Sequence, residues 1–154
     1  MKQFACRTLL FIFFAGTFVL GTVPRAQAGQ EHSCTTASLS GSFGYTSVGT
    51  LVGAESGPFV QVGRQTFDRK GNTTATATTS VNGSSFPVTI KGTYTMNPDC
   101  TGSLTLNVSP LGIAVHADFV ITDGGAEFRA MVTDSGSAVT VVGRKQFRSG
   151  EFDR

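Results

Sequence analysis

The residues best suited to bind a charged group are two arginines in a repeated six-residue motif. The motif V-G-R-x-x-F occurs at residues 62–67 and again at 142–147, with Arg64 and Arg144 at its third position. A guanidinium group pairs with a carboxylate or phosphate through two parallel hydrogen bonds. Two arginines that lie two strands apart, about 10 Å from each other, could therefore converge on one anion. This prediction requires matching strand registers and arginine side chains that point into the fold.

A second candidate for chemistry is the pair His116 and Asp118. A histidine beside a carboxylate can act as a general acid or base. Residues two apart on a strand share a face but rarely hydrogen-bond as catalytic dyads do, and no nucleophile is identifiable beside them. We therefore favour a surface role, in which Asp118 pairs with Arg129 across a hairpin and contributes at most ~1 kcal/mol.

Other motifs with a chemical mechanism are missing from the sequence. Serine and threonine are so common that none stands out as a nucleophile, and there is no G-x-S-x-G motif. Beyond the first 28 residues the chain has two histidines, His32 and His116, which do not make a zinc site alone. We expect no catalytic residue, no metal site and no cofactor.

The elements that must position these residues are short alternating runs separated by turn residues. No apolar period of 3.6 residues is long enough for a substantial helix. Pairs such as Asn82-Gly83 are typical of hairpin turns. We therefore predict eight strands. They cover residues 41–51, 59–68, 74–81, 86–96, 103–108, 113–122, 127–133 and 138–147.

Eight strands with short connections favour an all-β fold, an eight-stranded antiparallel up-and-down β-barrel, because closure removes unpaired strand edges. The interior of such a barrel is just wide enough for side chains or one small ligand. A β-sandwich is the alternative architecture. A barrel embedded in an outer membrane is disfavoured, since it needs two aromatic girdles and a tall apolar band.

Closure of the barrel explains the repeated motif. The second and eighth strands would flank the first and run in the same direction, so the two copies lie on either side of one strand. In each copy the arginine lies on one face, and the glycine and phenylalanine lie on the other. Gly63 and Gly143 would let a large side chain of the first strand approach the sheet closely. We favour this architectural role over a ligand-binding one. The aromatic residues expected at this end of the core are Phe43 or Tyr45, Phe67 and Phe147.

The first 28 residues have the pattern of a secretory signal peptide. An uncharged apolar run at residues 9–23 follows a basic start, and Ala26-Gln27-Ala28 provides a small-x-small cleavage site. A run of this length is shorter than the ~20 residues that span a bilayer. We predict cleavage after Ala28, one β-barrel domain over residues 29–154, a secreted or periplasmic location and no stable membrane insertion after cleavage.

The charge of the processed chain is close to zero. The whole sequence has twelve basic and ten acidic residues. Removal of Lys2, Arg7 and Arg25 with the signal peptide leaves nine basic residues and a net charge of −1. This balance does not favour a nucleic acid or an anionic membrane as the partner.

The two cysteines that remain after processing, Cys34 and Cys100, favour a structural disulfide. In an oxidising compartment a single pair most economically forms one bridge. No C-x-x-C motif occurs, and no histidine or acidic cluster lies beside either cysteine, so a redox or metal-binding pair is disfavoured.

Three segments carry a resemblance to known proteins. They are C-T-T-A-S-L-S-G-S-F-G-Y at residues 34–45, G-T-Y-T-M-N-P-D-C-T-G at 92–102 and A-D-F-V-I at 117–121. The combination resembles small secreted bacterial proteins of uncharacterised function with an allene oxide cyclase-like or lipocalin-like barrel. The resemblance rests on turn and packing residues. It implies the barrel and the Cys34–Cys100 pairing, and it carries over no activity.

The favoured function is non-catalytic binding of a small, at least partly apolar molecule, such as an amphipathic anion, in the barrel. Arg64 and Arg144 would anchor the anion, and Tyr45 and Tyr94 are the other candidate ligand contacts. One alternative is a shape-directed isomerase or cyclase of the allene oxide cyclase type. Another is a surface or matrix interaction protein with a packed barrel. A filled interior would exclude a ligand, whereas a cavity of ~300 Å³ or more would count against the packed barrel.

Overall fold

Eight β-strands and two short 3₁₀-helices make up the described part of the chain. The computed structural model describes residues 33–53 and 56–146. All eight predicted strands are present, and no boundary differs from its predicted position by more than two residues. The predicted signal peptide, residues 1–28, and Phe147 lie outside the described residues. In chain order the elements are η1 (Thr36–Leu39), β1 (Gly41–Leu51), β2 (Gly57–Phe67), β3 (Asn72–Val81), β4 (Ser84–Met96), β5 (Thr101–Ser109), β6 (Ile113–Thr122), η2 (Asp123–Gly125), β7 (Glu127–Val132) and β8 (Ser137–Lys145).

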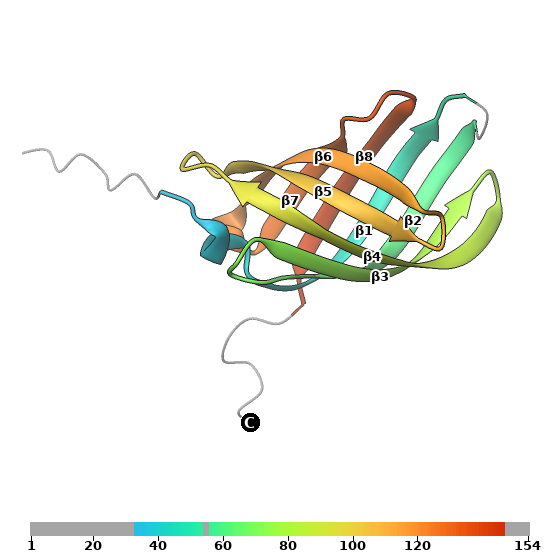
Figure 1. Ribbon diagram of the computed structural model, residues 1–154. Helices are drawn as coiled ribbons and strands as arrows, with labels where there is room; N and C mark the ends of the chain where they lie inside the picture. The colour runs from blue at the N-terminus through green and yellow to red at the C-terminus, as the bar shows by residue number, and fades with distance from the viewer. Residues whose placement is uncertain (1–32, 54–55, 147–154) are drawn as a thin grey trace, which may run out of the picture. The chain divides into compact units, whose positions relative to one another are not determined.

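The strands close into a barrel rather than a two-sheet sandwich (Figure 1). Each strand pairs antiparallel with the next one in sequence, and β8 pairs antiparallel with β1. Gly44 on β1 lies opposite Arg64 on β2 and opposite Arg144 on β8. The two copies of V-G-R-x-x-F therefore flank β1, as the sequence predicts, and the register places Arg64 and Arg144 at the same height.

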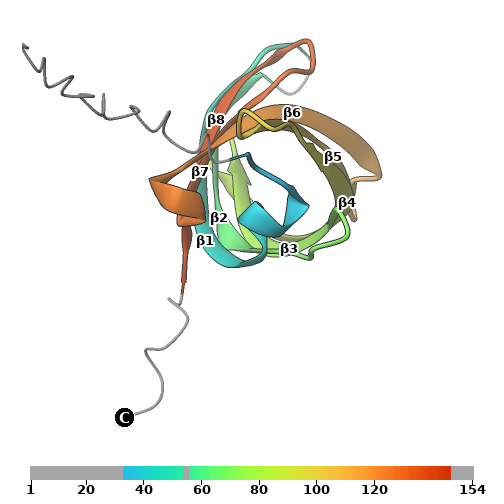
Figure 2. The same cartoon turned by 90° about the vertical axis from the view of Figure 1, so that its left-hand side faces the viewer.

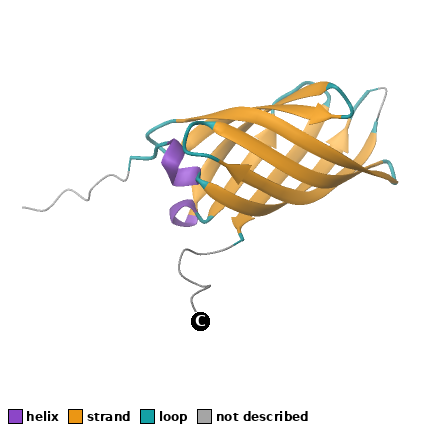
Figure 3. Ribbon diagram, turned by 60° about the horizontal axis from the view of Figure 1, so that its bottom comes forward, coloured by secondary structure: helices purple, strands orange, loops and turns teal. Residues whose placement is uncertain are grey.

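One end of the barrel is covered by η1, which lies across the opening in Figure 2 and is drawn as a purple helix in Figure 3. Leu39, the last residue of η1, is completely buried. A disulfide between Cys34 and Cys100, with Cα atoms 5.0 Å apart, fastens the segment before η1 to the β4–β5 turn. We refer to this end as the closed end, and to the end with the β1–β2, β3–β4, β5–β6 and β7–β8 connections as the open end.

Aromatic rings fill the half of the barrel next to the closed end. Phe67 contacts Phe43, Tyr94 and Phe128 with ring centroids 5.3–5.6 Å apart, in edge-to-face arrangements. Such pairs add roughly 0.5–1.5 kcal/mol each beyond the burial of their area. The inward side chains of the open half include serine, threonine, alanine and valine. They also include Phe59 and several leucines and isoleucines. The largest fully buried side chains, Phe43, Phe67, Phe128 and Leu39, are at the closed end, and the open half is left less filled.

Strand β2 turns a glutamine inward and two valines outward. Gln61 lies inside the barrel, whereas Val60 and Val62 are exposed, Val62 by 59%. The alternation of this strand is ambiguous in the sequence. The large ring of Phe67, which is 2% exposed, shares the face of Gln61 and favours burial of that face. Because side chains alternate along a strand, burying this ring places the valines outside.

The glycines of the repeat make room for neighbours, although not for those predicted. Gly143 lies opposite Phe128 of β7, and Gly63 lies opposite Ala77 of β3. A Cβ atom at Gly143 would overlap the Phe128 ring, and one at Gly63 would come too close to the Cβ of Ala77. Gly63 pairs with residues of β1 and β3, and Gly143 pairs with residues of β1 and β7. In both cases the atoms nearest to the glycine belong to the strand that is not β1. The prediction that Phe43 or Tyr45 takes this space is therefore wrong.

Candidate ligand-binding cavity

The open half of the barrel contains a cavity of about 180 Å³. The cavity borders the aromatic cluster at Phe128 and extends from there to residues at the open end of the barrel. Leu111 and Ile113, at the β5–β6 connection, line it and are about half exposed, so they stand at its rim. The cavity exists because small inward side chains such as Ala130 and Val139 leave space that the rings of the closed half do not reach.

One wall of the cavity is polar. Ser47, Gln61 and Thr79 occupy directly opposed inward positions on β1, β2 and β3, and we call them the polar row. Gln61 Nε2 donates a hydrogen bond to Thr79 Oγ1 at 2.6 Å, and the Tyr45 hydroxyl donates to Gln61 Oε1 at 3.0 Å. Below them, Gln65 Nε2 donates to Thr73 Oγ1 at 3.0 Å. The polar side chains thus form ordered networks on three neighbouring strands.

The remaining strands supply an apolar wall. Opposite the polar row, β4 to β8 contribute almost entirely aliphatic side chains to the cavity. The exceptions are Phe128 on β7 and Ser137, the first residue of β8. The aliphatic residues are Ile90, Leu104, Leu106, Val108, Leu111, Ile113, Val115, Ala117, Ala130, Val132, Val139 and Val141.

The cavity walls carry no charge. No acidic, basic or histidine side chain lines the cavity within the described part of the chain. Burial raises the pKa of the Tyr45 hydroxyl to about 12. This tyrosine is consequently protonated throughout the physiological range and acts as a neutral hydrogen-bonding group.

The other predicted ligand contact among the tyrosines, Tyr94, does not line the cavity. Its hydroxyl donates to the backbone carbonyls of Thr36 and Asp68 at the closed end. Burial, and secondarily the Asp68 carboxylate, raises the pKa of the Tyr94 hydroxyl. Tyr94 thereby holds η1 against the β2–β3 turn, whereas Tyr45 does line the cavity.

Arg64 and Arg144 lie on the outer face of the barrel, so neither lines the cavity. The Arg144 side chain is 78% exposed, and Arg64 Nη2 donates to Ser42 Oγ at 3.0 Å on the surface. The glycine and Phe67 of the repeat take the inner face, and alternation then sends the arginines outward. The inward orientation that the anionic anchor requires is therefore absent, and this part of the prediction is corrected.

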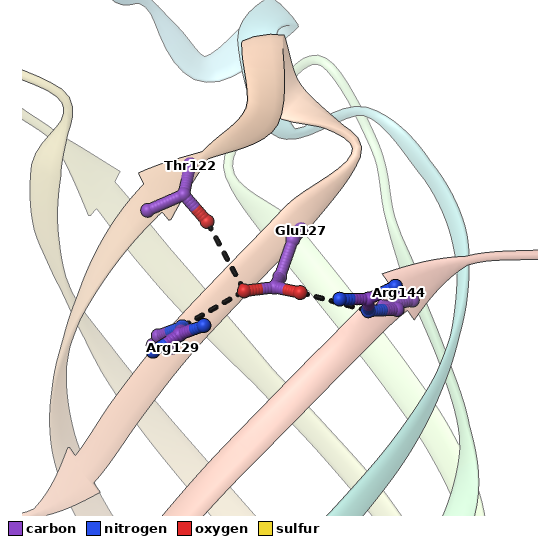
Figure 4. A network of polar contacts seen from close by, with 4 residues as sticks. All are labelled: Thr122, Glu127, Arg129 and Arg144. Atoms are coloured by element: carbon purple, nitrogen blue, oxygen red, sulfur yellow. Dashed lines mark hydrogen bonds and ion pairs between the residues drawn. The ribbon is translucent and has the colours of Figure 1, made fainter.

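The sequence does not reveal Glu127 as the partner of Arg144. One carboxylate oxygen of Glu127 accepts a hydrogen bond from Arg129 Nε at 2.8 Å, and the other accepts one from Arg144 Nε at 2.8 Å (Figure 4). Thr122 Oγ1 donates to the same carboxylate at 3.3 Å. The hydrogen bond from Arg129, together with the charge of both arginines, lowers the pKa of Glu127. The two arginines cover this carboxylate, whose side chain is only 7% exposed.

The predicted pair of Asp118 and Arg129 is wrong. Asp118 lies opposite Met131, and Arg129 lies opposite Val120. The turn before β7 includes Ala126, whose N–H donates to the Asp123 carbonyl at 3.0 Å, so pairing resumes only at Glu127. This longer turn shifts the register of the hairpin.

His116 contacts the carboxylate of Asp134, not that of Asp118 on its own strand. Its Nδ1 lies 2.8 Å from Asp134 Oδ1, and its backbone N–H donates to Asp134 Oδ2 at 2.6 Å. These bonds lower the pKa of Asp134, the backbone one most. Asp134 belongs to the β7–β8 connection, so the pair fastens that connection to β6 on the outer surface. No His116–Asp118 dyad forms.

Within residues 33–53 and 56–146, no group of three or more His, Cys, Asp or Glu side chains is placed to hold a metal ion. In the same part of the chain, no helix is long and apolar enough to cross a membrane.

Comparison with known proteins identifies similar folds but no family. No protein-family model and no curated protein matches the sequence. A redesigned β-barrel, b11L5F_LGL, is 18% identical with a TM-score of 0.52, and the match covers 73% of this chain and 96% of that one. A second redesigned barrel, mFAP1 bound to DFHBI, is 16% identical with a TM-score of 0.53 over 72% of this chain and 98% of that one. EF1p2_mFAP2b bound to DFHBI is 13% identical with a TM-score of 0.53 over 75% and 98%. At these identities the likeness establishes the barrel fold alone.

Proposed function

We propose that this protein is an exported carrier that binds one small, partly apolar molecule in its barrel without changing it chemically. The observation that carries this proposal is the contrast between the two halves of the interior. Aromatic rings pack the closed half, whereas the open half retains a cavity of about 180 Å³ that reaches the rim. The native disulfide and the predicted signal peptide support export.

The volume limits the size of the molecule. An engineered apolar cavity of about 150 Å³ admits benzene. Pockets for drug-sized ligands begin at ~300 Å³, and this cavity is smaller. The barrel thus accommodates a compact molecule of one or two rings, and a larger one requires movement of rim side chains such as Leu111 and Ile113.

Binding without catalysis is favoured over isomerase or cyclase activity. A shape-directed enzyme would use the same cavity. The lining residues in the described chain include no group that exchanges a proton near neutral pH, since Tyr45 has a pKa of about 12. The packed-barrel alternative requires a filled interior. The cavity of about 180 Å³ is smaller than the ~300 Å³ that would count against this alternative by volume, so binding of a small molecule is the test that separates the two.

The comparisons add support at the level of the fold. Two solved structures of similar fold, the redesigned barrel mFAP1 and EF1p2_mFAP2b, are bound to DFHBI. An eight-stranded barrel of this kind is therefore compatible with uptake of a small molecule. At 16% and 13% identity, the similarity concerns the fold and does not extend to the identity of the ligand.

Native mass spectrometry tests the proposal with two neighbouring variants of β8. Val141 lines the cavity, and Val142 is exposed on the outside. We expect the protein purified from its own host, without reducing agent, to carry a small-molecule adduct. Val141→Phe, which fills the cavity, should lose the adduct, and Val142→Phe should keep it, with circular dichroism confirming that both variants fold. An unliganded mass together with no binding of added naphthalene would contradict the proposal, as would an adduct that survives in Val141→Phe.

A further inference from the structure

The polar row lies on the side of the cavity formed by β1 to β3, which Tyr45 and Gln65 also line, whereas among the described lining residues of β4 to β8 the one polar side chain is Ser137. Ser47, Gln61 and Thr79 are adjacent across three strands, and each lies where an aliphatic residue would bury more apolar surface. Burial of a polar group has a free-energy cost unless the group is hydrogen-bonded. Three adjacent polar side chains in a mostly apolar cavity therefore indicate a hydrogen-bonding task inside the barrel.

The hydrogen bonds within the row leave groups that a ligand can use. Ser47 is 3% exposed and lines the cavity, yet no side-chain hydrogen bond joins its hydroxyl to the described residues. Gln61 uses its carbonyl oxygen and one N–H to bind Tyr45 and Thr79, and its amide has a second N–H. The Ser47 hydroxyl can donate or accept a hydrogen bond, and the second N–H of Gln61 can donate one. These two groups lie side by side on the cavity wall.

The same wall disfavours an ion. Burial of a charge that has no opposite charge beside it is costly, and the described cavity residues include no charged side chain. Arg64 and Arg144, which could have paired with an anion, lie on the outside. The recognition elements available to a ligand are therefore neutral hydrogen bonds along one edge and mainly apolar contact elsewhere, with aliphatic side chains and the rings of Phe59 and Phe128.

We propose that the ligand is a neutral, compact molecule with an apolar body and one hydrogen-bonding edge, and that Ser47 and Gln61 bind this edge. This inference rests on the proposed function and specifies its ligand class. Ser47 supplies a hydroxyl to which no side chain of the described residues is hydrogen-bonded. Gln61 is held in place from both sides, by the Tyr45 hydroxyl at 3.0 Å and by Thr79 Oγ1 at 2.6 Å, so its amide is oriented before the ligand enters.

Three probes of nearly the same shape test the inference. Naphthalene has the apolar body alone, 2-naphthol adds a neutral hydroxyl, and 2-naphthoate adds a negative charge at neutral pH. We expect 2-naphthol to bind about three- to tenfold more tightly than naphthalene, the range of one net neutral hydrogen bond. We expect 2-naphthoate to bind more weakly than either. Dissociation constants are measured by titration of the full processed protein, followed by nuclear magnetic resonance.

Two variants test whether Ser47 and Gln61 cause the preference for 2-naphthol over naphthalene. Ser47→Ala removes a hydroxyl that bonds to no described residue and leaves the Tyr45–Gln61–Thr79 chain in place, so the fold should be retained. We expect it to reduce the preference for 2-naphthol over naphthalene, and Gln61→Leu to abolish it. Thr46→Ala, on the exposed face of the same strand, is the matched control and should leave the preference unchanged.

The outcomes separate the inference from the proposed function. Equal binding of the three probes, tightest binding of 2-naphthoate, or a preference that survives in both variants would overturn the inference while leaving a ligand-binding barrel. Failure of all three probes to bind would contradict the proposed function and the inference together.

Discussion

The Tyr45 hydroxyl and the Gln61 side chain are joined inside the barrel by a hydrogen bond of 3.0 Å. This bond places a phenol in a water-poor interior, where its ionised form is disfavoured. The chain has two tyrosines in all and no tryptophan, and burial raises the pKa of both hydroxyls, that of Tyr45 to about 12. Their titration therefore reports directly on the interior of the fold.

We predict that Tyr45 of the folded protein stays protonated at the pH where free tyrosine ionises, about 10, and that Tyr94 ionises at a higher pH than free tyrosine. In denaturant both tyrosines should titrate near that value. Because the unfolded chain releases these protons first, the free energy of unfolding should fall as the pH rises from about 10 to 12. Ultraviolet titration of the native and denatured protein measures both effects. A titration midpoint near 10 for both tyrosines in the native protein would show that Tyr45 is not buried.

The disulfide should be a major source of stability. Cys34 and Cys100 are separated by 66 positions, and closure of a loop of this length constrains the unfolded chain by about 4 kcal/mol in the entropy model. We predict that Cys34→Ser/Cys100→Ser lowers the free energy of unfolding by about 2–4 kcal/mol while the far-ultraviolet circular dichroism of the barrel is kept. Denaturant unfolding measures the loss. Reductant should destabilise the wild-type protein to a similar extent and leave the double variant unaffected.

Two glycines on neighbouring strands should respond differently to the same substitution. A Cβ at Gly143 would overlap the Phe128 ring, whereas a Cβ at Gly44 would make ordinary contact with Gln146 at 3.7 Å. We predict that Gly143→Ala destabilises the fold by about 1–3 kcal/mol through overpacking. Gly44→Ala should change stability by less than about 0.5 kcal/mol. Similar denaturation midpoints for the two variants would refute the close approach of Phe128.

The network around Glu127 predicts a pH-dependent loss of stability. The Arg129 hydrogen bond and both guanidinium charges lower the pKa of Glu127, so the network stabilises the fold above the ordinary glutamate pKa. This contribution is lost as the pH falls through the lowered value. We predict that Glu127→Gln is less stable than the wild-type protein near pH 7. The difference should disappear in acid below the pKa of Glu127 in the folded state.

The control for this effect is Asp118, an exposed carboxylate of the same hairpin to which no described residue is hydrogen-bonded or ion-paired. Asp118→Asn should leave the unfolding midpoint nearly unchanged at both pH values. If the two variants behave alike, the contacts of Glu127 with Arg129 and Arg144 do not stabilise the fold.

Much of the architecture could be predicted from local sequence. Turn residues mark the strand ends. The Asn82-Gly83 hairpin, where both residues have positive φ of 48° and 87°, shows why such pairs are reliable signals. Closure, predicted from eight strands with short connections, also explains the repeated V-G-R-x-x-F motif, because Arg64 and Arg144 occupy equivalent positions on either side of β1.

The contents of the interior could not be predicted in the same way. On β2 the valines and glutamines alternate in a pattern that allows either face to be buried. Only the fit of Phe67 into the aromatic cluster settles which face lies inside. The Glu127–Arg144 contact joins two strands whose register depends on the tertiary fold. Long-range register and side-chain volume thus decide the site, and neither is a local property of the sequence.

Nuclear Overhauser contacts measure most directly whether the open half of the barrel admits a small molecule. The protein would be methyl-labelled and saturated with naphthalene. We predict cross-peaks from the ring protons to the methyl groups of Leu106 and Val139, which line the cavity. Cross-peaks confined to the outward Val60 and Val62, or no cross-peaks at saturation, would contradict a ligand-binding interior.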